Sequence, residues 1–189
     1  LFNRLTGIRQ KTGNWPGVTV ERKSGSAEID GREIEVVDLP GIYSFDAASL
    51  DERVTRDYLL GRSADLIVNV VDAANLERNL YFTVQLLEMG VPIVVALNMM
   101  DVARKRGLRI DIEGLARRLG CPVVPIVATT GEGGSELKAR MLDVADRRLT
   151  PGFPLALDEA VEQAQQRLLP LVADADPANR RWLALKLLE

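Results

Sequence analysis

Residues 33–41 read E-I-E-V-V-D-L-P-G, and this stretch decides the fold of the chain. An apolar run leads to Asp38, and a tight turn with Pro40 and Gly41 follows at once. The pattern is typical of a buried strand that delivers a carboxylate to the carboxyl edge of an open α/β sheet, where such sheets bind ligands. Because Gly41 has no side chain, its backbone N–H can approach a phosphate closely. An aspartate at a strand end is more often structural, so this motif needs support from the rest of the chain.

Strands and helices alternate after this stretch. Short apolar runs predict strands over residues 64–72, 92–97 and 122–127. Amphipathic segments predict helices over residues 49–60, 76–89, 112–119 and 134–148. Because the strands are apolar almost throughout, we expect an α/β fold with a mostly parallel sheet that is covered by helices on both faces.

Turn residues define the part of the chain before Asp38. The Asp30-Gly31 pair predicts a tight hairpin between strands over residues 18–27 and 32–38. Residues 11–21 contain Gly-Asn and Pro-Gly pairs, and we expect them to form a loop.

Helix ends are also visible in the sequence. The first six residues have helical spacing of their apolar side chains, and Gly7 ends the predicted helix. The segment S-L-D-E at residues 49–52 predicts a capping box at a helix start. Asp72 is expected to cap the helix that follows it.

The composition excludes several classes of function. The chain has 189 residues, 47% hydrophobic and 27% charged, which fits one globular domain with a small appendage. A net charge of −3 offers no basic field for nucleic acid or an anionic membrane. Because the chain has no histidine, catalysis would use carboxylates, backbone dipoles or bound ions. The single cysteine, Cys121, excludes an internal disulfide and is expected to be a buried, unreactive thiol.

A second group of polar residues, Asn98-Met99-Met100-Asp101, follows the predicted strand over residues 92–97. The Asp101 carboxylate can accept two N–H bonds from the edge of guanine, and adenine lacks that pair of donors. The Asn98 amide can bond the base and tie neighbouring loops together. Taken alone, the same residues also fit a turn asparagine and a helix-capping aspartate.

A third group, Ala128-Thr129-Thr130-Gly131, follows the next predicted strand. Its backbone N–H groups suit the O6 atom of guanine, although taken alone it fits an ordinary strand-to-helix loop. Thr19, Asp38-x-x-Gly41, Asn98-x-x-Asp101 and Ala128-Thr129 occur in the order of a GTP-binding domain. Each group follows a predicted strand or lies in a loop. The four motifs are weak evidence singly, but in this order and context they strongly indicate a GTP-binding domain.

On these motifs the chain resembles the cytosolic N-terminal GTPase domain of bacterial ferrous-iron transporters of the FeoB family. The most specific stretches are G-N-W-P-G-V-T-V-E-R-K (13–23), V-D-L-P-G-I-Y-S (37–44), N-V-V-D-A-A-N-L-E-R-N-L-Y (69–81) and V-A-L-N-M-M-D (95–101). The resemblance implies a P-loop GTPase-type sheet over residues 1–149. It also implies part of a small α-helical domain over residues 150–189, where R-R-W-L-A-L-K-L-L-E (180–189) matches the family pattern.

The resemblance further implies that residues are missing before Leu1. The family's first strand and its phosphate loop, Gly-x-x-x-x-Gly-Lys-Ser/Thr, are expected just upstream. A chain that truly lacked this loop would bind GTP poorly, so we expect the sequence to omit these residues. The loop over residues 44–49 is also a few residues shorter than in the family.

The family pattern assigns nucleotide contacts to the loop before the hairpin and to three strand ends. These residues are Gly17, Val18, Thr19, Val20, Glu21, Asp38, Leu39, Pro40, Gly41, Asn98, Met99, Met100, Asp101, Ala128, Thr129 and Thr130. By the same resemblance, Thr19 and Asp38 would hold Mg²⁺, and Thr19 and Gly41 would act in catalysis. The backbone carbonyls of Gly13 and Trp15 would hold an activating K⁺.

Two replacements predict a slow enzyme that releases its nucleotide quickly. Ile42 stands where many GTPases place a water-orienting glutamine, and an isoleucine cannot orient water. Met99 stands where many GTPases have lysine, and it keeps the apolar stem but loses the charge. The two tryptophans are expected to differ in role. Trp15 fits a core anchor and an exposed switch residue equally well, whereas Trp182 fits helix packing.

The favoured function is a GTP-hydrolysing domain at the cytoplasmic face of the bacterial inner membrane. It would bind GTP and GDP and regulate Fe(II) uptake by the transporter's own membrane domain, with self-association allowed and no role for nucleic acid. A nucleotide-sensing switch without useful hydrolysis is a second hypothesis, which Ile42 keeps open. A ribosome-assembly GTPase is a third, but it needs a basic RNA-binding extension, and the net charge of −3 argues against it.

Overall fold

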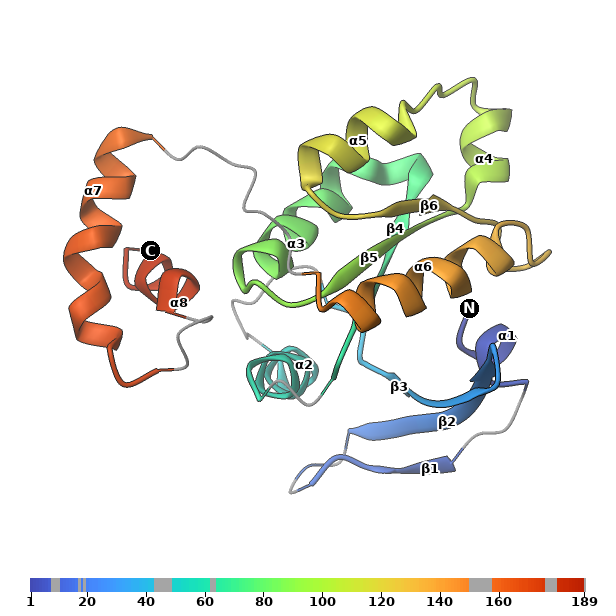
Figure 1. Cartoon of the computed structure of the whole chain (residues 1–189), viewed down its shortest axis with the longest axis horizontal. Coiled ribbons are helices and arrows are strands. Elements are labelled where there is room, and N and C mark those ends of the chain that lie inside the picture. The colour runs from blue at the N-terminus through green and yellow to red at the C-terminus, as the bar shows by residue number, and fades with distance from the viewer. Residues whose placement is uncertain are drawn as a thin grey trace.

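The computed structural model describes residues 1–7, 11–16, 18, 20–42, 49–61, 64–149, 158–175 and 180–188. Within these residues the strands form one antiparallel and one parallel sheet, each of three strands, with helices around them (Figure 1). The predicted α/β class is confirmed. The separation into two sheets was not predicted, because strand pairing between distant segments leaves no local pattern.

The antiparallel sheet contains β1 (Lys11–Asn14), β2 (Glu21–Ile29) and β3 (Arg32–Asp38) in that order. The predicted hairpin is confirmed, with Asp30 and Gly31 at φ 49° and 74°. Both values are left-handed, as a two-residue turn between twisted strands requires.

The predicted loop over residues 11–21 is wrong at its start. Lys11–Asn14 pairs with β2 and forms the edge strand β1. All four residues of β1 are exposed, so no alternation of apolar and polar side chains marks the strand in the sequence.

The parallel sheet contains β4 (Ile67–Asp72), β5 (Ile93–Asn98) and β6 (Val123–Pro125) in that order. β5 lies in the middle, and its residues before Asn98 are all buried. Asp72 and Asn98 are register partners, so β4 and β5 end side by side. The three predicted strands are confirmed, with β4 and β6 shorter than predicted and β5 shifted by one residue.

Helices precede, connect and follow these strands. They are α1 (Phe2–Thr6), α2 (Leu50–Leu60), the 3₁₀ helix η1 (Ala73–Asn75), α3 (Leu76–Glu88), α4 (Met100–Lys105), α5 (Ile112–Leu119), α6 (Gly134–Arg147), α7 (Glu159–Leu168), the 3₁₀ helix η2 (Leu169–Val172) and α8 (Arg180–Lys186). Among the described helices, none combines the length and apolar character that a membrane span requires.

The predicted helix ends are largely confirmed. Ser49 Oγ accepts the Glu52 N–H at 3.2 Å, and the Ser49 N–H donates to Glu52 Oε2 at 3.0 Å, which is the expected capping box. Gly7 ends α1 with a left-handed φ of 60°. α4 was not predicted, because its six residues are too few to show a helical period.

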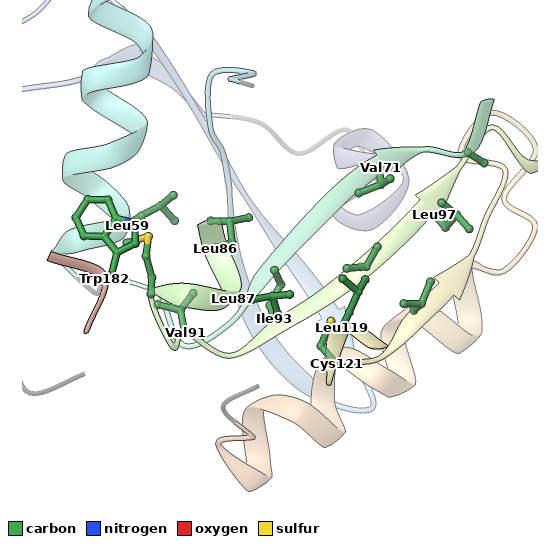
Figure 2. Close-up of a cluster of buried hydrophobic side chains, with 14 of the residues drawn as sticks. Leu59, Val71, Leu86, Leu87, Val91, Ile93, Leu97, Leu119, Cys121 and Trp182 are labelled. Carbon is green, nitrogen blue, oxygen red and sulfur yellow. The ribbon is translucent and has the colours of Figure 1, made fainter. Parts of the chain in front are cut away.

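Two hydrophobic clusters cover opposite faces of the parallel sheet. Ile93, Val95 and Leu97 of β5 join side chains of α2, α3 and α5 in one cluster (Figure 2). Val94 and Ala96 join α1, α6 and β2 in the other. Because successive residues of a strand point to opposite faces, one apolar strand supplies both clusters. The prediction of helices on both faces is confirmed for this sheet.

The C-terminal helices α7 and α8 pack on one another, and α8 also packs on the first cluster. Gln165 of α7 is buried, and its Nε2 donates to the Arg181 carbonyl oxygen at 3.0 Å. Trp182 of α8 is buried beside Leu59 (Figure 2), which confirms its predicted role in helix packing. The predicted boundary at Thr150 lies outside the described residues, so the division into two domains stays a prediction.

Cys121 provides a test of this packing. The thiol is buried, and burial raises its pKa from 9.0 to about 12. At pH 8 the folded protein should therefore react with iodoacetamide at least on the order of a thousand times more slowly than the chain in urea, because only the thiolate reacts. Mass spectrometry of timed samples measures both rates, and equal rates would contradict a buried thiol.

Candidate nucleotide-binding site

Asp38 is the last residue of β3 and lines an open cavity of about 640 Å³. The cavity lies between the start of β2, the turn after β3 and the start of α2, and is lined by Val20, Glu21, Lys23, Asp38, Leu39, Pro40, Gly41, Leu50 and Asp51. Buried Thr55 of α2 holds the turn in place, because its hydroxyl donates to the Pro40 carbonyl oxygen at 3.1 Å. The structure thus gathers the Asp-x-x-Gly motif, Val20 and Glu21 around one hollow.

The lining of this cavity fits a hard divalent cation beside an anionic ligand. The Asp38 carboxylate is exposed there, and Glu21 and Asp51 add two more. Mg²⁺ prefers oxygen ligands and is usually held by one or two carboxylates together with water and phosphate oxygens. A β-carbon added to Gly41 would meet no described atom within 4 Å, so there is open space beside this backbone position. Within the described part of the chain no three His, Cys, Asp or Glu side chains form a metal cluster.

Trp15 is a buried anchor for the loop before β2. It is 7% exposed, its ring meets that of Tyr58 on α2 edge-to-face at 5.2 Å, and the Arg22 guanidinium lies 5.1 Å from its centre. The same burial raises the pKa of Tyr58. Of the two readings of Trp15, the structure favours the core anchor.

The backbone of this loop forms a short turn. The Trp15 N–H donates to the Val20 carbonyl oxygen at 2.9 Å, and the Trp15 carbonyl oxygen accepts the Val18 N–H at 3.2 Å. Gly13 belongs to β1. Gly17 and Thr19 lie outside the described residues, so their assigned roles remain predictions.

The end of β5 is tied to the end of β6 by a side chain. Asn98 Oδ1 accepts the Ala128 N–H at 3.0 Å, and the Met100 N–H donates to the Ile126 carbonyl oxygen at 3.4 Å. The predicted tie between neighbouring loops is confirmed. It brings the second and third groups of predicted residues together at one edge of the parallel sheet.

Asp101 lies in the first turn of α4 and is half-buried. The residue at the cap position is Met99, with a left-handed φ of 62°, and no side chain caps this helix. The alternative of a helix-capping aspartate at Asp101 is therefore wrong. Within the described residues, its carboxylate makes no hydrogen bond or ion pair, which leaves both oxygens available to a ligand.

Asp72, at the end of β4, has the structural role that was predicted. Its Oδ1 accepts the Ala74 N–H at 2.7 Å, and its Oδ2 accepts a hydrogen from Asn75 Nδ2 at 2.7 Å. Both oxygens are engaged in starting η1.

Two arginines hold the loop between β6 and α6 at points that sequence reasoning missed. Arg4 of α1 donates to the Thr129 carbonyl oxygen, and Arg104 of α4 pairs with Glu132. Arg4 lies 125 residues from its partner, so no spacing in the sequence could reveal the contact. Gly131 permits it, because a β-carbon there would lie 3.1 Å from Arg4 Nη1.

The predicted residues therefore form two groups. The cavity group surrounds Asp38 on the antiparallel sheet, and the edge group surrounds Asn98 and Asp101 on the parallel sheet. The cavity lining includes no residue of the edge group, and no described hydrogen bond joins the two.

Gly133 provides a test of how the edge group is built. Its φ is 77°, and a β-carbon would lie 2.2 Å from the Pro125 carbonyl oxygen. Gly133→Ala should lower the free energy of unfolding by about 1–3 kcal/mol, measured by urea denaturation. Gly134→Ala is the matched control, because its β-carbon would meet nothing within 4 Å, and it should leave stability unchanged or raise it by up to about 1 kcal/mol. Equal effects would contradict the close approach at Gly133.

Known proteins share this sequence and fold. The family described as ferrous iron transport protein B matches residues 1–141. The Fe(2+) transporters FeoB of Escherichia coli (strain K12) and Salmonella typhimurium (strain LT2) are 46% and 48% identical over the whole chain, which covers 25% of each relative. The cytosolic domain of the T. maritima FeoB iron transporter is similar in its GDP form I and its GMPPNP form, with TM-scores of 0.91 and 0.90. Both are 40% identical, and the matches cover 98% of this chain and 72% and 73% of theirs. The chain spans about a quarter of the length of the transporters it matches. Because the family profile matches most of the chain, the transporters are 46–48% identical over its whole length and the fold is the same, this chain belongs to the ferrous iron transport protein B family.

Proposed function

We propose that this chain binds GTP and GDP, hydrolyses GTP, and thereby regulates Fe(II) uptake by the membrane domain of the same protein. The observation that carries the proposal is the 3.0 Å hydrogen bond from the Ala128 N–H to Asn98 Oδ1. It joins two strand ends into one edge, beside a half-buried Asp101 with free oxygens. The T. maritima relative described in GDP and GMPPNP forms supports the same ligand class here.

Base recognition follows from the donors and acceptors at this edge. The Asp101 carboxylate accepts the N1 and exocyclic N–H hydrogens of guanine, and backbone N–H groups of residues 128–130 donate to O6. Adenine lacks both of these N–H donors, so it would leave the Asp101 oxygens unpaired. Met99 covers the base with its apolar side chain and adds no charge, which favours fast release.

The cavity group is proposed to bind the phosphates of the nucleotide. The Gly41 N–H would donate to the γ-phosphate, and Asp38 and Thr19 would supply oxygens to Mg²⁺. When bound there, Mg²⁺ would supply positive charge to the phosphates, which is most of what phosphoryl transfer needs from a protein. These residues orient the terminal phosphate for attack by water.

Ile42 has no polar atom on its side chain with which to orient the attacking water. The carbonyl oxygens of Gly13 and Trp15 are proposed to bind K⁺, which would supply positive charge near the transferred phosphate. A carbonyl oxygen has two lone pairs. The Trp15 carbonyl oxygen can therefore bind a cation while it accepts the Val18 N–H.

The relatives of the chain support a proposal for its location. Those relatives are Fe(2+) transporters four times its length. We place the chain at the cytoplasmic face of the inner membrane, beside the membrane domain, where nucleotide is available. Self-association is compatible with this arrangement.

Replacing Asp101 with asparagine tests base recognition. An amide cannot accept both guanine hydrogens but can donate to the 2-oxo group of xanthine. Asp101→Asn should weaken GDP binding by about 100-fold or more and favour xanthosine diphosphate, as measured by competition with a fluorescent nucleotide. Asp65→Asn makes the same chemical change at an exposed position away from both groups and should change neither affinity. An unchanged preference for GDP in Asp101→Asn would contradict the proposal that Asp101 recognises guanine.

Single-turnover hydrolysis in K⁺ and in Na⁺ separates the enzyme from a switch without useful hydrolysis. With the full-length protein at constant ionic strength, we expect GTP cleavage at least about tenfold faster in K⁺. GDP affinity, measured in both salts, serves as the control and should stay constant. Rates near zero in both salts would favour the nucleotide-sensing switch, the second candidate that Ile42 supports.

A further inference from the structure

Arg104 lies between two acidic residues that belong to different parts of the edge group. Asp101 precedes it by three residues on α4, and Glu132 lies on the loop between β6 and α6. Figure 1 shows α4 and this loop at the same end of the molecule. The Arg104 guanidinium can therefore form an ion pair with either of two carboxylates, Asp101 or Glu132.

The choice matters because the two acids have different tasks. On a helix, side chains three residues apart are neighbours, and an aspartate and an arginine at that spacing attract one another. An arginine paired with Asp101 would occupy the oxygens that have to accept the guanine hydrogens. An unengaged Arg104 is thus a competitor of the base for the same carboxylate.

The structure shows Arg104 engaged by Glu132. Its Nη2 atom pairs with Glu132 Oε1, and its Nη1 atom lies 3.5 Å from Oε2, so both ends of the guanidinium face the glutamate. The pKa of Arg104 is raised, first by the hydrogen bond and charge of Glu132 and to a smaller extent by Asp101. Within the described residues Asp101 forms no ion pair of its own.

The backbone of Glu132 is held independently of its side chain. Its carbonyl oxygen accepts the Val127 N–H at 3.0 Å, and its N–H donates to Thr130 Oγ1 at 3.3 Å. Changing the carboxylate to an amide therefore leaves these loop contacts in place. The side chain can be tested for its charge alone.

We propose that Glu132 is a positioning residue for guanine recognition, because it holds Arg104 away from Asp101 and so keeps that carboxylate free for the base. The inference rests on the proposed function, in which Asp101 reads guanine. It assigns to an exposed ion pair a role in ligand affinity rather than in stability.

A double-mutant cycle in the full-length protein tests the inference. Glu132→Gln should weaken binding of a fluorescent GDP by about two- to fivefold, the range expected for one competing exposed ion pair. Arg104→Ala should bind at least as tightly as the wild type, since the competitor is gone. Combining the two changes should restore the affinity of Arg104→Ala. Added NaCl should reduce the defect of Glu132→Gln, because salt screens the new pair.

Asp146→Asn is the matched control, because it breaks another exposed ion pair, which joins Asp146 of α6 to Arg32 of β3. It should leave GDP affinity unchanged. Equal weakening of GDP binding by Glu132→Gln and Arg104→Ala would mean that the pair only fastens the loop, and it would overturn the inference. Wild-type GDP affinity in Glu132→Gln would overturn it as well. A wild-type protein that bound no guanine nucleotide would instead refute the proposed function.

Discussion

The burial of β5 on both faces is the constraint on which the rest of the structure depends. The strand pairs with β4 on one side and β6 on the other, and its residues before Asn98 are all buried. A strand in that position has to be apolar throughout, so polar side chains that could bind a ligand occur only at its end. Asn98 is that end, and its amide joins β5 to the loop after β6. The same constraint that builds the core thus decides where a ligand can meet polar groups.

The two hydrophobic clusters explain how the helices position the loops. One cluster gathers α2, α3 and α5 and includes Trp182, so the C-terminal helix α8 shares its packing (Figure 2). α2 in turn holds the Asp-x-x-Gly turn through Thr55 and the loop before β2 through Tyr58. Packing on one face of the sheet therefore has consequences for the cavity around Asp38.

The edge group is held by two kinds of contact, buried and exposed. The edge group is fixed by buried strands and a hydrogen bond from a backbone N–H to a side-chain amide, and Gly133 approaches β6 too closely for any β-carbon. The contacts made by Arg4 and Arg104 with the adjoining loop are exposed. Such contacts contribute little to stability individually. One of them, the Arg104–Glu132 pair, is proposed to keep the Asp101 carboxylate available to a ligand.

By itself, the sequence determined the elements and the chemistry of their ends. Hydrophobic period, the Asp30-Gly31 turn and the capping box at Ser49 are local signals, and they located the strands, the hairpin and the helix starts. The four short motifs located Asp38, Asn98 and Asp101 for the same reason, since each lies within a few residues of a strand end. The sequence did not predict β1 or α4, because β1 is exposed throughout and α4 is too short to show a helical period of apolar residues. Only the tertiary structure decided the separation into two sheets, the burial of Trp15 and the partners of Arg4 and Arg104. Those features depend on contacts between segments far apart in the chain, and neither spacing nor composition records such contacts.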